Sequence, residues 1–312
     1  MSANLPDAID RMADAIVTAH ADALALPVSE AAPAAPAAAP AVYRAALKAA
    51  AALGFGAADA ACIAHAWQTR TERTHLFDAR SWPDRAADFG LPPWPRAAAY
   101  APCPHALGLY AVMPDAAWVG RMAVAGVPTL QLRFKSDDPA AVRAEVHNAV
   151  ASVRGTAARL FINDHWQVAI EAGAYGVHLG QEDLDRITPG GLATIRDAGL
   201  RLGISSHGYA EMKRADALGP SYIALGAVFA TTLKQMPTAP QGLGRLHAYA
   251  RLLHDRPLVA IGGIDADRLA AVLACGVGSV GVVRALLAAA NPDTTAAAWT
   301  ARIAAATGAA RY

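Results

Sequence analysis

The chain has 312 residues, a formal net charge of +1 and a hydrophobic fraction of 54%, much of it alanine. This length allows one large domain with an appendage, and the near-neutral charge without Lys/Arg blocks argues against a general nucleic-acid surface. Apolar runs are too short to span a bilayer, and the N-terminal stretch MSANLPDAIDRMADAI has acids where a secretory signal needs a basic end. We therefore expect neither a membrane nor a nucleic acid as a partner.

Cysteine and histidine usage predicts a cytoplasmic protein without a zinc site. Cys62, Cys103 and Cys275 are scattered and odd in number, which indicates a reducing compartment rather than a disulfide framework. The ten histidines show none of the spacings that zinc ligands use. Local clusters of cations remain available to small anionic ligands.

The first hundred residues predict a mainly helical extension. An apolar stripe indicates a first helix, and its members are Ile9, Met12, Ala13, Ile16 and Val17. The Ala/Pro-rich segment 30–41 predicts a stiff linker, and 42–66 predicts a helix broken at 54–56, with Asp59 as a possible N-cap of the second part. Residues 80–104 predict irregular connecting chain. We place the domain boundary between residues 104 and 105.

From residue 105 onward, short apolar runs alternate with helical patterns. Eight runs are candidate strands, at residues 106–113, 127–134, 159–164, 175–180, 200–206, 221–229, 257–263 and 278–283. Such alternation implies parallel strands with crossover helices. Eight units in about 200 residues favour an α/β protein of the (β/α)₈ TIM-barrel type over 105–312, with a doubly wound open sheet as the alternative.

The second candidate strand carries polar residues on one side. Gln131, Arg133 and Lys135 alternate with Leu130, Leu132 and Phe134. A solvated strand face is one explanation. In a barrel, however, the inner faces of the strands meet the active site at their C-terminal ends, where cations without partners are costly to bury. The barrel therefore predicts that these groups bind an anion.

Two carboxylates follow neighbouring strands. Asp164 comes after Asn163 at the end of the third strand, and Asp183 lies just beyond the fourth. Two facing carboxylates repel unless one is protonated or a divalent cation lies between them. Mg²⁺ suits such a site when phosphates supply further oxygens. The alternatives are a helix cap for Asp164 and a solvated turn for Asp183.

The later strand ends add groups that suit phosphate. The loop 227–242 has the length and composition of a loop that closes over a ligand, and the glycines of IGGI (261–264) let backbone N–H groups approach a phosphate. Side chains available to anions at these ends are Ser205, Thr231, Thr232, Lys234 and Arg284. Helix capping, a solvated loop and an outward-facing helix position are their alternatives. Together the groups predict a diphosphate site with Mg²⁺ and a separate monophosphate site, which indicates transfer chemistry.

Six motifs in order resemble the thiamine phosphate synthase family, particularly its proteobacterial form, over residues 105–312. They are QLRFK, FINDHW, YGVHLGQEDL, GISSH, KQMPTAPQGL and VAIGGI. The resemblance implies a Mg²⁺-dependent transferase of thiamine biosynthesis. It would join 4-amino-2-methyl-5-hydroxymethylpyrimidine diphosphate to 4-methyl-5-hydroxyethylthiazole phosphate and release pyrophosphate, which leaves before the thiazole nitrogen attacks.

The resemblance also implies roles for individual residues. The residues matching the pyrimidine-diphosphate site are Gln131, Arg133, Lys135, Asn163, Ser205 and Lys234. Among them, those expected to act in catalysis are Arg133, Lys135, Ser205 and Lys234. The residues matching the Mg²⁺ ligands are Asp164 and Asp183. Those matching the thiazole-phosphate site are Thr231, Thr232, Gly263 and Val283.

The chain departs from the family pattern near the thiazole phosphate. The family's P-T-x-T-K loop begins here with Ala230 and has Leu233 in place of its second threonine, and Arg284 stands where a serine is expected. We hypothesise that Arg284 compensates for the lost hydroxyl, because an arginine can pair bidentately with a phosphate. Arg284 is therefore also a predicted substrate-binding residue.

Two other functions share this barrel type. A thiazole tautomerase, with His207 as an acid–base residue, is the nearest alternative, and a non-catalytic sensor of thiamine precursors is the other. The stretch AALGFGAADAACIAHAW is similar to the helical tail of hydroxymethylpyrimidine phosphate kinase, but the extension has no nucleotide-binding signature. A fusion remnant and an oligomerisation arm are the alternatives for this extension, and a homo-oligomer is an open expectation.

Overall fold

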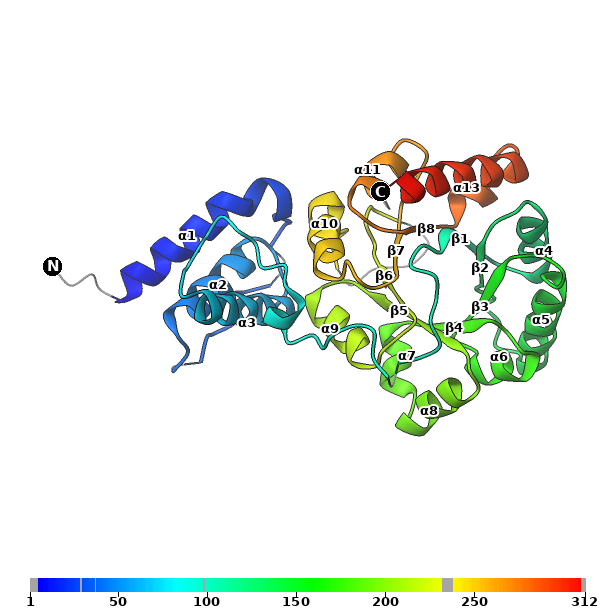
Figure 1. Cartoon of the computed structure of the whole chain (residues 1–312), viewed down its shortest axis with the longest axis horizontal. Helices are drawn as coiled ribbons and strands as arrows, with labels where there is room; N and C mark the ends of the chain where they lie inside the picture. Colours follow the sequence, from blue (N-terminus) through cyan, green and yellow to red (C-terminus); the bar gives the residue numbers. More distant parts are fainter. Residues whose placement is uncertain (1–4, 29, 37, 98, 232–237, 310–312) are drawn as a thin grey trace.

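The computed structural model describes residues 5–28, 30–36, 38–97, 99–231 and 238–309 (Figure 1). A closed barrel of eight parallel strands follows a set of helices at the N-terminus. Within the described part of the chain, none of the helices has both the length and the apolar character that a bilayer span requires.

All eight predicted strands are present, and each lies within its predicted range. They are β1 (Gly108–Met113), β2 (Thr129–Leu132), β3 (Arg159–Asn163), β4 (Gly176–Leu179), β5 (Arg201–Ser206), β6 (Tyr222–Leu225), β7 (Leu258–Ile261) and β8 (Ser279–Val282). The first strand pairs with β2 on one side and with β8 on the other, so the sheet has no free edge. The TIM barrel is confirmed, and the open-sheet alternative is wrong.

Helices follow the strands and cover the outside of the barrel (Figure 1). They are α4 (Ala116–Val124), α5 (Pro139–Ser152), α6 (Trp166–Ala172), α7 (Gln181–Arg186), α8 (Pro189–Asp197), α9 (Tyr209–Ala217), α10 (Gly242–Leu252), α11 (Leu269–Ala274), α12 (Arg284–Leu287) and α13 (Pro292–Ala309). Local sequence sets several of their ends: Asp115 and Asp138 accept hydrogen bonds from the first turns of α4 and α5.

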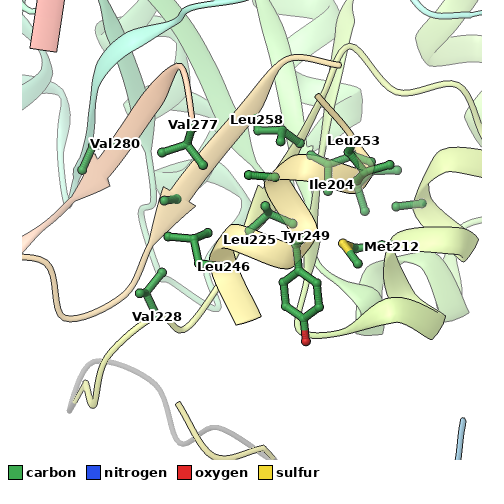
Figure 2. Close-up of a cluster of buried hydrophobic side chains, with 14 of the residues drawn as sticks. Ile204, Met212, Leu225, Val228, Leu246, Tyr249, Leu253, Leu258, Val277 and Val280 are labelled. Atoms are coloured by element: carbon green, nitrogen blue, oxygen red, sulfur yellow. The ribbon is translucent and has the colours of Figure 1, made fainter. Parts of the chain in front are cut away.

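The two-residue period of the strands divides the apolar side chains between two cores. Alternate residues of each strand point outward, and Figure 2 shows Ile204, Leu225 and Leu258 on the strands beside Met212 of α9 and Leu246 of α10. The other residues point inward and form a separate buried cluster. Its members are Leu107, Tyr110, Val112, Phe161, Tyr222, Ala224 and Val259.

The N-terminal extension consists of α1 (Leu5–Leu24), α2 (Ala41–Ala52), α3 (Ala57–Thr74) and the short 3₁₀ helix η1 (Ala86–Phe89). The predicted stripe is confirmed, with Ile9, Ala13 and Ile16 buried. The helices lie against one side of the barrel, where α1 contacts α10 and α3 contacts α9 (Figure 1). The boundary between residues 104 and 105 stays a prediction.

The predicted cap for the helix after the break is wrong. Gly56 occupies the N-cap of α3, and Asp59 lies inside its first turn. The Asp59 carboxylate instead accepts a hydrogen bond from the Ala210 N–H, at the start of α9 in the barrel. Capping residues act close to a helix start, and the true start of α3 lies three residues earlier than Asp59 would need.

A buried ion network joins the connecting segment to the barrel. The carboxylate of Asp216, at the end of α9, is fully buried and accepts hydrogen bonds from Arg256 Nε at 2.5 Å and from Arg96 Nη2 at 2.8 Å. Arg256 Nη2 also donates to the Pro92 carbonyl at 2.9 Å. The connecting segment predicted at 80–104, which is irregular apart from η1, is therefore held against the barrel by buried charges.

Replacement of Asp216 should be strongly destabilising. Asp216→Ala removes the buried carboxylate that Arg96 and Arg256 share and leaves Arg256 only its more exposed partner Asp255, so we expect the free energy of unfolding to fall by about 3–5 kcal/mol. Denaturant unfolding measures the change. The control is Asp293→Ala, which removes an exposed ion pair with Arg121 and should have little effect. Equal losses of the free energy of unfolding in the two variants would contradict a stabilising role for the buried Asp216 network.

Candidate active site

A cavity of about 790 Å³ opens at the carboxyl ends of the barrel strands. Every described residue of the predicted site lines it: Gln131, Arg133, Lys135, Asn163, Asp164, Asp183, Ser205, Thr231, Gly263, Val283 and Arg284. Thr232, Leu233 and Lys234 lie outside the described residues. Strand β2 ends at Leu132, so Gln131 belongs to the strand, whereas Arg133 and Lys135 follow it at the mouth of the cavity. Because Gln131 is buried, a solvated strand face does not describe it.

A chain of hydrogen bonds crosses the barrel interior beneath the cavity. Tyr110 OH donates to Gln131 Oε1 at 2.9 Å, so the Tyr222 hydroxyl, 2.6 Å from Tyr110 OH, must donate to Tyr110. His178 Nδ1 lies 2.7 Å from Tyr222 OH and therefore donates to it. His178 Nε2, 2.8 Å from Ser205 Oγ, then accepts the serine hydrogen. In this arrangement, Ser205 presents oxygen lone pairs to the cavity.

The other end of the chain is formed by two amides. Gln131 Nε2 donates to Asn163 Oδ1 at 2.7 Å, which directs the amide nitrogen of Asn163 toward donation in the cavity. Both residues are buried, so their orientation is set by these bonds rather than by water. Burial lowers the pKa of His178 to about 4, so the imidazole is neutral near neutral pH, as the donor order requires.

Asp164 and Asp183 form the predicted carboxylate pair. Asp164 follows β3 in a left-handed backbone conformation, with φ of +64°, and its Oδ2 lies 2.6 Å from Lys135 Nζ. Asp183 extends from the first turn of α7, where its Oδ2 accepts the Gly180 N–H at 2.8 Å. The two carboxyl groups are close enough to shift each other's pKa. The alternative role of Asp164 as a helix cap is wrong, because His165 occupies the N-cap of α6.

The pKa values of the two carboxyl groups are shifted in opposite directions. Burial would raise the pKa of Asp164, but the Lys135 ammonium and the neighbouring Asp183 carboxyl group outweigh it and hold this pKa below its usual range. Burial and the neighbouring Asp164 raise the pKa of Asp183. Among the described residues, no cluster of three or more His, Cys, Asp or Glu surrounds the pair. Two carboxylates beside an open cavity fit a cation such as Mg²⁺, which takes its other oxygens from phosphates and water.

Glycines shape the far side of the cavity. Gly262 and Gly263 have φ of +106° and +63°, and a Cβ on Gly263 would lie 2.5 Å from the Ala230 carbonyl oxygen. The turn after β7 therefore lies directly against the loop after β6, to which it is tied by the bond from Phe229 N to Gly262 O. Arg268 Nη1 donates to the Gly263 carbonyl at 2.7 Å. This part of the cavity, with Arg284 in its lining, suits a second anion.

Sequence reasoning missed three residues of the interior hydrogen-bond chain, namely Tyr110, His178 and Tyr222. Each is a polar residue at an inward-facing position of an otherwise apolar strand. The two-residue alternation of the barrel, applied to β1, β4 and β6 as it was to β2, would have found them.

The fold and the cavity define a TIM barrel with an active site suited to phosphorylated small molecules. A family model described as thiamine monophosphate synthase matches residues 109–286, and the chain belongs to this family. The family resemblance read from the six motifs is therefore confirmed. The match begins after the N-terminal extension.

Several relatives carry the same description. The chain is 52% identical over 200 residues to a thiamine-phosphate synthase of Neisseria meningitidis, covering 64% of this chain and 96% of the relative. It is 55% identical over 194 residues to a thiamine-phosphate synthase of Serratia proteamaculans, covering 62% and 89%. The solved thiamine phosphate pyrophosphorylase of Pyrococcus furiosus is 25% identical with a TM-score of 0.53, covering 63% of this chain and 96% of that one.

Burial of His178 should make stability depend on pH. The unfolded chain takes up a proton on this histidine near pH 6.5, whereas the folded protein does so only near pH 4. The stability that comes from keeping His178 neutral is therefore complete above about pH 6.5 and is lost as the pH falls toward about 4. Between about pH 7 and about pH 5, we expect wild type to lose about 2 kcal/mol more free energy of unfolding than His178→Gln. Denaturant unfolding at both pH values measures this, and equal losses would contradict a buried neutral imidazole.

Proposed function

We propose that the protein is a thiamine phosphate synthase that joins the hydroxymethylpyrimidine diphosphate to the hydroxyethylthiazole phosphate. The observation that carries the proposal is the meeting of Arg133 and Lys135 with the Asp164–Asp183 pair at one cavity rim. In the reaction, the bond from the pyrimidine methylene carbon to the diphosphate oxygen breaks, and a bond from the thiazole nitrogen to that carbon forms. Pyrophosphate takes the electrons of the broken bond.

The cavity supplies what a departing diphosphate needs. Arg133 and Lys135 lie at its mouth and would balance the negative charge that develops on the leaving group. Lys135 would exchange part of its contact with Asp164 for a phosphate oxygen. The Asn163 amide donates toward the same space, and Ser205 would donate there in place of Asn163 if the hydrogen bonds beneath the cavity reversed. No protein nucleophile is required, since the thiazole nitrogen attacks the carbon directly.

Asp164 and Asp183 are the residues that would hold Mg²⁺. Burial and the neighbouring Asp164 carboxylate raise the pKa of Asp183, which indicates a pair that a cation would stabilise. Bound there, Mg²⁺ would neutralise part of the charge on the leaving diphosphate. Lys135, which now balances Asp164, would then be available to the substrate.

The glycine turn provides the second phosphate site. Gly263 and Thr231 line the cavity on the side opposite the carboxylate pair in strand order, and Val283 and Arg284 follow β8 beside them. Backbone N–H groups at the turn and the Arg284 guanidinium would bind the thiazole phosphate. A thiazole phosphate bound there would lie next to the pyrimidine methylene carbon, and this orientation would contribute to the rate.

A thiazole tautomerase is the second candidate, because His207 lines the cavity and its Nδ1 lies 2.7 Å from Glu211 Oε2. A histidine paired with a carboxylate suits proton transfer. An isomerase of this kind has no need, however, of the carboxylate pair or of the cations after β2. The synthase accounts for more of the cavity.

The reaction is tested with both substrates, with and without Mg²⁺. We expect pyrophosphate and thiamine phosphate in equal amounts, and Asp183→Asn should lower kcat/KM about a hundredfold. Asp185→Asn is the matched control, because Asp185 lies on the same helix in an exposed ion pair with Arg214. Binding of both substrates without product would favour a sensor, and isomerisation of the thiazole would favour the tautomerase.

Arg284 should assist the thiazole phosphate rather than obstruct it. A charge-assisted hydrogen bond contributes about 1.5–3 kcal/mol, so Arg284→Ser should raise the KM for thiazole phosphate about tenfold or more. The KM for the pyrimidine diphosphate should change little, and steady-state kinetics with each substrate varied separates the two. Arg302→Ser, on the outer helix α13, is the control. A lower KM in Arg284→Ser would show that the arginine obstructs the site.

A further inference from the structure

The N-terminal extension is fixed to the barrel through a buried cation. Arg245 of α10 is only 3% exposed and reaches into the extension, where its Nε donates to the Leu24 carbonyl at 2.9 Å and its Nη2 to the Leu53 carbonyl at 2.8 Å. Leu24 ends α1 and Leu53 follows the last turn of α2. Helix C-termini carry partial negative charge, so they suit a guanidinium. The side chain also stacks over the Phe55 ring at 3.6 Å.

A second contact joins the extension to α9. Asp59 Oδ1 accepts the Ala210 N–H at 2.8 Å, in the first turn of α9. Gly208, the N-cap residue of α9, has no side chain with which to cap the helix. A Cβ on Gly208 would lie 2.0 Å from Asp59 Oδ2. The absence of a side chain at Gly208 thus makes room for the Asp59 carboxylate. Asp59, from a distant part of the chain, caps α9 in place of a local residue.

The chain that enters α9 forms one wall of the active site. Ser205, Ser206 and His207 line the cavity and directly precede the helix. Ser206 Oγ donates to the Gly208 carbonyl at 3.1 Å, and Glu211 in the first turn of α9 accepts from His207 N at 2.8 Å. The conformation of residues 205–207 therefore depends on the position of the first turn of α9.

We propose that Asp59 is a positioning residue for the active site. By capping α9, it holds the β5–α9 turn in the geometry that presents Ser205 to the substrate diphosphate. The extension is then a working part of the enzyme, because it supplies a cap that the barrel itself lacks. The kinetic side of this inference rests on the proposed synthase function, whereas the order of the turn does not.

The first test compares Asp59→Ala with Asp59→Asn, which keeps an oxygen acceptor for the Ala210 N–H. Misplacement of a contacting group lowers rates strongly, so Asp59→Ala should lower kcat/KM for the pyrimidine diphosphate about tenfold. Asp59→Asn should keep most of the wild-type kcat/KM. Hydrogen exchange of the amides at 208–212 should become faster in Asp59→Ala and stay near wild type in Asp59→Asn.

The matched control is Asp88→Ala. Asp88 is also a buried carboxylate of the extension, but its partner, Arg73, lies in the same extension. This variant should lose stability, yet at a temperature where all variants are folded it should keep wild-type kinetics and wild-type exchange at 208–212. Equal loss of activity in Asp59→Ala and Asp88→Ala would overturn the inference and leave a structural role only.

A double-mutant cycle tests the contact itself. The backbone of Gly208 is extended, with φ of −177°, so alanine is allowed there apart from its clash with Asp59. Gly208→Ala alone should reproduce the faster exchange of Asp59→Ala, and it should add little in the Asp59→Ala background. Additive effects would overturn the inference. If wild type makes no thiamine phosphate, the proposed function fails, but the exchange measurements still decide whether Asp59 orders the turn.

Discussion

Closure of the sheet between β1 and β8 is the constraint on which the active site depends. In a barrel of parallel strands, the active-site residues lie at the carboxyl ends of the strands. A closed sheet brings all eight of these ends together in one ring. Residues separated by more than a hundred positions, such as Arg133 and Arg284, then share one cavity. The inward alternation of the strands fills the barrel below the ring with Tyr110, Phe161 and Tyr222, so the cavity has a solid floor.

The electrostatics of the ring follow from this geometry. Cations after β2 face carboxylates after β3 and β4, and the Lys135–Asp164 contact balances them in the absence of substrate. A diphosphate with its cation would bring a matching set of charges and could replace that contact without leaving either residue unpaired. The floor contributes in another way, because the buried His178 stays neutral and adds no charge to compete with the ring.

Much of the fold and cavity could be predicted because both depend on local patterns. Strand–helix alternation located all eight strands, and residues at strand ends located the lining from Gln131 to Arg284. The roles of these residues in catalysis and binding stay predictions. What sequence reasoning missed depends on contacts between distant segments: Asp59 caps a helix in another part of the chain, and Asp216 joins two arginines from separate loops. Neither pairing leaves a periodic signal.

The hydrogen-bond chain beneath the cavity makes its two ends mutually dependent. Each hydroxyl and the neutral imidazole donate one hydrogen and accept another, so the bonds from Ser205 to Asn163 all run in one direction. When a ligand takes the Ser205 hydrogen, the chain keeps all its bonds only if each of them reverses, and the Asn163 amide then turns its oxygen toward the cavity in place of its nitrogen. Ser205 and Asn163 therefore cannot both donate to one ligand through this chain. In either direction, one of the two end residues presents a donor to the cavity and the other presents an acceptor. The direction of the chain therefore depends on whether a bound ligand accepts or donates a hydrogen bond at each end.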